Sequence, residues 1–223
     1  MKKNSNMIFG MIVTIVALGL ISLLVILSDT ESEPTTTTTD EKVNIENQPT
    51  LGKTDAPVTI VEFGDFKCPA CKAWGEEILP KLLNDYIDNG KVKFSYVNVL
   101  FHGEESKLAA LAAESVLKRS PDQYWKFHKT LFENQPNNDS EWITLDKLLE
   151  ISEDISGIST VQLEEDVKSE KENAEVIRDT KLVEKHNINR TPTIVINDTI
   201  ISDPFDYEQI VTGIENALEE ENE

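Results

Sequence analysis

Residues 61–71, VEFGDFKCPAC, decide the fold because they join a β-rich run to two cysteines that lie two residues apart. The run at 58–63 (VTIVEF) is short, β-branched and apolar, which predicts a buried strand. Cys68 and Cys71 are the only cysteines in the 223 residues. A bond between them would close a tiny loop and remove little entropy from the unfolded chain. Their role is therefore predicted to be chemical rather than structural.

A helix is predicted to begin at the first cysteine. Apolar side chains recur at helical spacing through 69–87, and Pro80 is expected to kink this helix. Cys68 would then lie at the helix N-terminus, where free N–H groups and the helix dipole favour a negative charge. Pro69 suits the first helical position because its missing N–H would have gone unused. We expect Cys68 to be the accessible nucleophile and Cys71, one turn further on, to be the buried resolving thiol.

The rest of the chain predicts an α/β fold built on a mixed central sheet. A second strand at 92–99 follows the helix and implies a right-handed parallel crossover, and much later a hairpin is expected at 193–196 and 200–202, before a final helix at 207–218. The 93 residues between these halves are too many for an unstructured loop. They predict a helical subdomain inserted at about 103–187, with helices at 106–118, 121–132, 144–151 and 161–185.

The N-terminal segment predicts a membrane anchor. Residues 7–27 contain 21 residues without a charge, enough for a helix that crosses a bilayer. Two lysines precede them and three acids follow, so residues 1–27 are expected to form a cytoplasmic stub and a transmembrane helix. A cleaved signal peptide is the alternative, and it leaves the compartment unchanged. Residues 28–50, with five consecutive threonines, predict a disordered stalk before a folded domain at 51–223.

Charge and metal-ligand spacing narrow the classes of partner. The chain has 41 acidic and 21 basic residues, a net charge of -20 that should repel nucleic acid. Such acidity permits a calcium site, but no D-x-D-x-D-G loop with a distal glutamate supports one. Zinc would need four ligands, and His102, His128 and His186 lack the spacing of partners to the cysteines. No metal site is therefore assigned from the sequence.

Two further features have a functional and an ordinary interpretation. Glu62 is a charge inside an apolar strand, six positions before Cys68. It is either a buried acid that exchanges a proton with Cys71 or a partly exposed charge paired with a lysine. Thr191-Pro192 stands directly before the strand at 193–196, and the general rarity of cis X-Pro bonds favours an ordinary trans proline there.

Taken together, residues 61–71, LGKTDAPVTIVEF at 51–63, the helical insertion and RTPTIVIN at 190–197 resemble the DsbA-like thiol-disulfide oxidoreductases. These have the thioredoxin fold, and the resemblance is greatest to the membrane-anchored BdbD type, over about 51–218. It implies that Cys68 is the nucleophile, Cys71 the resolving cysteine and Glu62 the buried acid. It also implies a cis-proline loop of Thr191 and Pro192 that faces the cysteines and, with Pro69 and Ala70, contacts the substrate.

The resemblance implies an extracytoplasmic oxidase in the cell membrane that introduces disulfides into exported proteins without a bound cofactor. A quinone-linked membrane protein of the DsbB kind would reoxidise it. The dipeptide Pro69-Ala70 lacks the histidine of the best-known members, so one source of thiolate stabilisation is missing. A disulfide reductase or isomerase on the same fold therefore stays open, as does a metal-binding or chaperone-like module.

Overall fold

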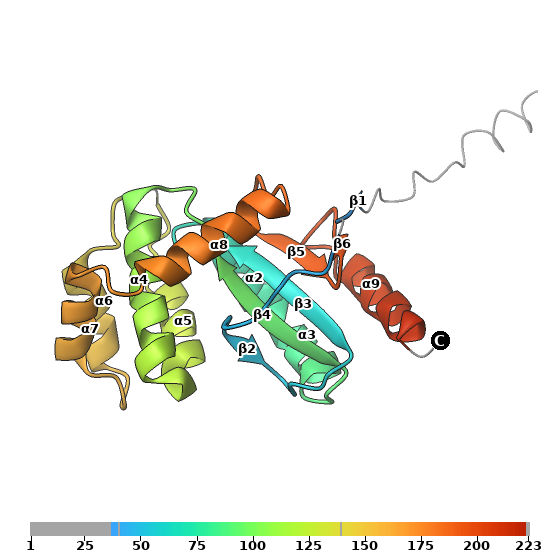
Figure 1. Ribbon diagram of the computed structural model, residues 1–223, viewed down its shortest axis with the longest axis horizontal. Helices are drawn as coiled ribbons and strands as arrows, with labels where there is room; N and C mark the ends of the chain where they lie inside the picture. The colour runs from blue at the N-terminus through green and yellow to red at the C-terminus, as the bar shows by residue number, and fades with distance from the viewer. Residues whose placement is uncertain (1–36, 40, 139, 222–223) are drawn as a thin grey trace, which may run out of the picture. The chain divides into compact units, whose positions relative to one another are not determined.

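The computed structural model describes residues 37–39, 41–138 and 140–221. Within them the core is a six-stranded sheet with the order β1-β6-β5-β3-β4-β2 (Figure 1). Only the central pair β3 and β4 is parallel, and every other neighbouring pair is antiparallel, which confirms the mixed sheet. The strands are β1 (Thr37–Thr38), β2 (Thr50–Leu51), β3 (Val58–Gly64), β4 (Val92–Asn98), β5 (Thr193–Ile196) and β6 (Thr199–Ile200).

Alternation along the central strands gives the sheet two buried faces. One face carries Ile60, Phe94 and Ile194, which pack in one cluster with Trp74 of the helix that begins at the cysteines. The other carries Val61, Phe63, Val97 and Val195, which pack against Leu182 of the inserted subdomain. Because both faces are covered, a charged side chain on β3 is removed from solvent whichever way it points.

The helix expected at 69–87 is divided into three pieces: α2 (Pro69–Glu77), α3 (Leu79–Leu82) and a π-helical turn η1 (Leu83–Ile87). The break falls at Ile78, two residues before Pro80, whose ring cannot donate a backbone hydrogen bond. The π-helical turn was not predicted, because apolar spacing does not distinguish it from a regular helix. The strand, helix and strand at 58–98 otherwise follow the predicted crossover.

The predicted helical subdomain lies between β4 and β5 and extends beyond one end of the sheet, while α8 crosses back over it (Figure 1). A single helix at 161–185 is wrong: α7 and α8 are separated by a turn in which Glu170 has a φ of 49°. The elements are α4 (Glu104–Arg119), a 3-10 turn η2 (Pro121–Gln123), α5 (Tyr124–Glu133), α6 (Leu145–Glu153), α7 (Thr160–Lys168) and α8 (Asn173–Lys185), and the final helix is α9 (Tyr207–Glu220).

The stalk predicted at 28–50 ends too late, because its last residues belong to the folded domain. Val43 is buried in the cluster that contains Val61 and Val97, and Thr50 pairs with Ser95 as part of β2. Residues 41–50 are therefore attached to the folded domain through a few buried side chains, because isolated apolar side chains in a polar segment can still fill gaps beside a sheet. The hairpin also differs slightly, since its second strand is Thr199–Ile200 rather than 200–202.

Among the described residues, no helix has the length and apolarity that crossing a bilayer requires. The predicted anchor at 7–27 and the first part of the predicted stalk lie outside the described residues.

Candidate active site

The structure places Cys68 where the sequence predicted it. Cys68 is the N-cap residue of α2 and Pro69 is its first helical residue. Both cysteines are free thiols, with Cys68 7% exposed and Cys71 completely buried. This difference matches the expected roles, because an incoming thiol can reach only a sulfur at the surface.

The surroundings of Cys68 lower the pKa of its thiol from 9.0 to about 5. The largest cause is a hydrogen bond from the Cys71 side chain, and desolvation opposes it. Thr191 and the backbone N–H groups of Cys71 and Ala70 contribute further stabilisation of the thiolate. The start of the helix thus supplies part of what a histidine in the dipeptide would have supplied.

Thr191 and Pro192 face the cysteine pair. Their peptide bond is cis, as the resemblance implied, so the trans interpretation is wrong. Cys68 Sγ lies 3.5 Å from the carbonyl oxygen of Thr191. The loop is held from behind, because Thr193 Oγ1 donates to the carbonyl oxygen of Arg190 at 2.8 Å. The described chain therefore brings together two segments that are 123 positions apart.

Glu62 is buried beneath the pair and is not a surface charge. Glu62 is 1% exposed, and its Oε1 atom has no hydrogen-bond partner among the described residues. Desolvation, followed by repulsion from Cys68, raises the pKa of Glu62 well above 4.5. Burial likewise raises the pKa of Cys71, with Cys68 and Glu62 as further causes. An acid and a thiol whose pKa values are both raised thus lie within electrostatic reach of each other.

Asp65 is a site residue that the sequence did not single out. It is 1% exposed, and its Oδ2 atom accepts hydrogen bonds from His102 Nδ1 at 2.8 Å and from Ser106 Oγ at 2.9 Å. Its backbone N–H donates to Cys71 Sγ at 3.4 Å. Asp65 therefore fastens the loop before α2 to the start of α4. The feature of the sequence that could have identified Asp65 is its position between β3 and the first cysteine.

A second group of polar side chains lies apart from the cysteines, at the end of β4. Asn98 Nδ2 donates to Glu114 Oε1 at 2.8 Å and to Asp179 Oδ2 at 2.7 Å, and Gln48 Nε2 donates to Asp179 Oδ1 at 2.6 Å. Desolvation first, and repulsion from Asp179 second, raise the pKa of Glu114 to about 8. Desolvation raises the pKa of Asp179 to about 6.

These four side chains are those whose chemistry fits a hard cation. The Oε1 atom of Gln48 and the Oδ1 atom of Asn98 are buried without a partner. Rotating each amide by 180° would point these oxygens toward the carboxylates. A Ca²⁺ ion between them could then be coordinated by carboxylate and amide oxygens. The group contains only two carboxylates and no histidine or cysteine. Among the described residues, no three His, Cys, Asp or Glu side chains lie close enough together to hold a metal ion. We refer to Gln48, Asn98, Glu114 and Asp179 as the carboxyamide cluster.

The three histidines do not gather around the cysteines. His102 contacts Asp65, His128 is buried among the aromatic rings of α5 and β4, and His186 packs near Phe63. Burial lowers the pKa of His128 to about 3, so this side chain is neutral at physiological pH. Zinc coordination by the cysteine pair thus finds no histidine partner in the described residues.

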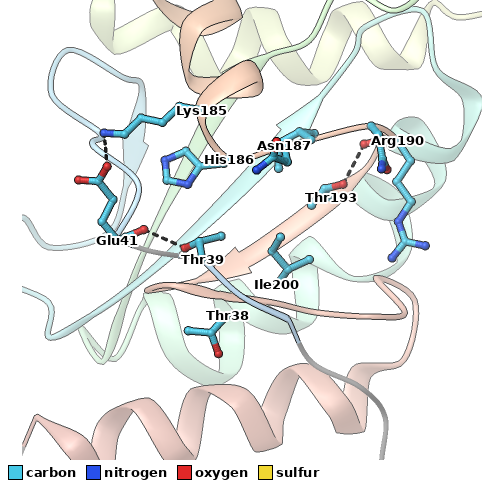
Figure 2. Close-up of a pocket in the computed structure, with 11 residues that line it drawn as sticks. Thr38, Thr39, Glu41, Lys185, His186, Asn187, Arg190, Thr193 and Ile200 are labelled. Atoms are coloured by element: carbon cyan, nitrogen blue, oxygen red, sulfur yellow. Dashed lines mark hydrogen bonds and ion pairs between the residues drawn. The ribbon is translucent and has the colours of Figure 1, made fainter.

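A cavity of about 580 Å³ is lined by residues on either side of the cis-proline loop in the sequence, among them Arg190 and Thr193 (Figure 2). Arg190 and Thr193 line it on one side, and on another the Lys185 ammonium is 2.5 Å from the Glu41 carboxylate. Neither cysteine contributes to its walls. Two smaller cavities, of about 360 and 310 Å³, both include Pro69 beside Cys68. The described surface beside the reactive thiol is therefore hollowed on two sides of Pro69.

A slightly exposed thiol of low pKa, a fully buried thiol one turn away and a facing cis-proline loop on a mixed sheet define a class of protein. The class is that of thiol-disulfide oxidoreductases with the thioredoxin fold, in which the cysteine pair itself is the redox group. A thioredoxin family model matches residues 44–216. The chain belongs to this family, as a DsbA-like thiol-disulfide oxidoreductase.

The individual relatives agree with this assignment. Disulfide bond formation protein D of Bacillus subtilis is 48% identical over 175 residues, which are 78% of this chain and 79% of that protein. The probable disulfide bond formation protein D of Bacillus cereus is 35% identical over 209 residues, covering 92% and 94%. The crystal structure of oxidised BdbD from Bacillus subtilis matches with a TM-score of 0.79 and 46% identity, over 82% of this chain and 98% of that one.

Proposed function

We propose that the protein is an oxidase that introduces disulfides into exported proteins through Cys68 and Cys71. The observation that carries this proposal is the low pKa of Cys68, about 5. A stabilised thiolate favours the reduced pair, so the disulfide is a stronger oxidant. At pH 7 the pKa of Cys68 lies two units below the pH, and this difference raises the reduction potential of the cysteine pair by roughly 60 mV. This value is an upper limit, because solvent screens the charge of a partly exposed thiolate.

The reaction begins with the oxidised pair. A thiolate of the substrate attacks Cys68 Sγ, the bond between the two sulfurs breaks, and the electron pair goes to Cys71 Sγ, which takes a proton from the Glu62 carboxyl group. A second substrate thiolate then attacks the substrate sulfur of the mixed disulfide. Cys68 leaves as a stabilised thiolate, and the substrate leaves with a new disulfide.

The cis-proline loop gives the substrate a place to bind. The Thr191 backbone faces Cys68, so an extended substrate segment can pair with it while its cysteine reaches Cys68 Sγ. Pro69 and Ala70 border the same surface. Main-chain pairing reads no particular sequence, which suits an enzyme that acts on many proteins.

The location and the source of oxidising equivalents are part of the same proposal. The uncharged stretch at 7–27 supports a membrane anchor with the catalytic domain outside the cytoplasm. An oxidase needs an acceptor for two electrons after each turnover, and a quinone-linked membrane protein of the DsbB kind would supply it. A tether would raise the local concentration of the enzyme at that partner.

Trapping tests the roles of the cysteines. Cys71→Ser lacks the thiol that can attack Cys68 Sγ and release a substrate with no second thiol in reach, so it should accumulate adducts with exported proteins through Cys68. Cys68→Ala is the matched control, and it should trap none. An absence of adducts in cells that export cysteine-containing proteins would contradict the proposal, and adducts with both variants would assign the wrong nucleophile.

A redox titration of the pair against glutathione separates the oxidase from the alternatives on the same fold. The oxidase predicts a potential well above that of thioredoxin, which is about -270 mV. A value near that figure would identify a reductase instead. A chaperone-like module would keep its activity in Cys68→Ala, whereas the oxidase loses it.

A further inference from the structure

Four buried polar atoms without hydrogen-bond partners lie in the region beneath Cys71. They are Glu62 Oε1 on β3, Tyr96 OH on β4, and Tyr124 OH and His128 Nε2 on α5. None of these four residues is more than 4% exposed. Buried polar groups in native proteins nearly always have a partner, which is a protein atom or an ordered water. Several unpartnered groups in one region therefore indicate a common partner.

The strand register places Glu62 and Tyr96 side by side. They are direct partners in the parallel pairing of β3 with β4, so their side chains project from the same face of the sheet. Gly64 follows on that face, and a Cβ atom built there would lie 2.8 Å from Tyr96 OH. The hydroxyl thus lies over the Gly64 backbone, directly before Asp65, whose N–H donates to Cys71 Sγ.

Tyr124 belongs to the same region. The His128 ring packs edge-on against Tyr96 with 4.6 Å between the ring centroids, and its centroid is 6.0 Å from that of Tyr124. Both tyrosines and Cys71 are members of one buried cluster, which joins the sheet to α5. Two hydroxyl groups therefore lie in the same buried cluster as the resolving thiol, and the buried carboxyl group of Glu62 is next to them through its pairing with Tyr96.

We propose that a buried water joins the Glu62 carboxyl group to the Tyr96 hydroxyl, with Tyr124 as a further partner, and that Tyr96 is thereby a positioning residue for proton exchange with Cys71. A buried water makes about three hydrogen bonds, which a carboxyl oxygen and two hydroxyl groups can supply. Tyrosine hydroxyls can donate, so they stabilise the carboxylate form of Glu62. The inference rests on the role proposed above for Glu62.

The affected step is the closure of the Cys68–Cys71 disulfide. Cys71 gives its proton to the Glu62 carboxylate, and its thiolate attacks Cys68 Sγ in a mixed disulfide with glutathione. The bond from Cys68 to the glutathione sulfur breaks, and glutathione leaves as a thiolate that takes a proton from solvent. Two electrons pass from the cysteine pair to the glutathionyl group. The step therefore needs Glu62 in its ionised form.

The groups around Glu62 determine how readily it ionises. Cys68 and Cys71 of α2 oppose its negative charge, and Ile194, its partner on β5, is apolar. Among the described groups of this region, the hydroxyls of Tyr96 and Tyr124 can donate to the carboxylate, and so can His128 Nε2 in the tautomer that carries a proton there. Removing the Tyr96 hydroxyl should raise the pKa of Glu62 by about one unit, which slows closure about tenfold below that pKa.

A double-mutant cycle on the rate of closure tests the inference. Tyr96→Phe should slow closure about tenfold at pH values below the pKa of Glu62 and shift the pH profile of closure upward by about one unit. Glu62→Gln should slow closure more, and Tyr96→Phe should then add nothing in the Glu62→Gln background. Tyr86→Phe is the matched control, because the Tyr86 hydroxyl is bonded to Glu215 at 2.9 Å in a different cluster.

Each outcome has a defined meaning. A Tyr96→Phe effect that persists in the Glu62→Gln background, or no shift in the pH profile, would overturn the inference while leaving the role of Glu62 intact. If Glu62→Gln itself closes at the normal rate, the proposed proton exchange fails first. Should Tyr96→Phe not fold, Tyr124→Phe must give a smaller upward shift of the same profile, and the infrared band of the Glu62 carboxylic acid reports the titration directly.

Discussion

The thiol sulfur of Cys68 lies 3.5 Å from the main-chain carbonyl oxygen of Thr191, across 123 positions of sequence. This contact joins the helix that activates the nucleophile to the loop that receives the substrate. The Cys71 side chain is the largest cause of the lowered pKa of the same sulfur. Cys68 Sγ is therefore both the reactive atom and the atom next to the loop that receives the substrate. Its pKa is the first property to measure.

Alkylation of the reduced protein should follow the thiolate of Cys68. Because its pKa is about 5, the rate of reaction with iodoacetamide at Cys68 should rise through pH 5 and be nearly constant above pH 7. Absorbance of the thiolate at 240 nm should show the same midpoint. Cys71 should remain unmodified, since burial raises its pKa. A midpoint near pH 8 to 9 for Cys68 would contradict the lowered pKa.

Substitutions around Cys68 should raise its pKa in a definite order. The Cys71 side chain is the largest stabilising cause and Thr191 is a smaller one. Cys71→Ala should therefore raise the midpoint by about 1–2 pKa units, and Thr191→Val by less than one. Cys71→Ser is the matched control because its hydroxyl can still donate, so its midpoint should stay closer to that of the parent. The reverse order, with Thr191→Val larger, would reject this account.

Local sequence was enough to predict the nucleophile and the elements next to it. A β-branched run before Cys68 and a proline directly after it determine a strand, a turn and a helix start within about fifteen residues, so no distant contact was required. The resemblance added the cis bond before Pro192, which generic X-Pro statistics disfavour. What was predictable thus depended on short-range order or on a known relative.

Features that depend on distant segments were not predictable. The carboxyamide cluster draws on positions from 48 to 179, and no one segment carries a calcium-binding pattern. Local sequence left Glu62 with two equal interpretations, because its burial depends on the neighbouring strands and the helix that covers them, and only the resemblance assigned it as the buried acid. The break between α7 and α8 depends on a positive φ at Glu170, a residue type that gives no warning of a turn.

Glu62 should reduce the stability of the protein at neutral pH. Its pKa is raised in the folded state, so the folded form binds more protons than the unfolded form between pH 4.5 and that pKa, and stability falls as pH rises through this range. Glu62→Gln should therefore raise the free energy of unfolding at pH 8, by about 1.4 kcal/mol for each pKa unit removed. The gain should vanish at pH 4, where the Glu62 carboxyl group is mostly protonated in the folded and in the unfolded protein.

Thermal unfolding of the reduced protein at the two pH values measures this difference. Glu46→Gln is a suitable control, because Glu46 is an exposed acid on the same chain. An equal change for the two variants, or a gain that is the same at pH 4 and pH 8, would show that Glu62 is not destabilised by burial.

Calcium should stabilise the protein through the carboxyamide cluster. Glu114 and Asp179 have pKa values of about 8 and about 6, so without a cation stability falls as pH rises from about 4 to 8. A bound Ca²⁺ ion would offset their repulsion and needs both carboxylates ionised. At a hundredfold excess over Kd the gain is about 2.7 kcal/mol, or roughly 5–10 °C in Tm. The gain should be larger at pH 8 than at pH 5.

Melting curves in CaCl2 and in a chelator, at matched ionic strength, check this expectation. Glu114→Gln should abolish the response to calcium and raise Tm in the chelator, because it removes one of two repelling acids. Glu175→Gln removes a half-buried acid whose side chain pairs with Arg178, so it makes the same charge change nearby and should keep the response. Equal Tm values with and without calcium at pH 8 would leave the cluster as a proton-sharing pair of acids, with the Asn98 amide as its only bridge.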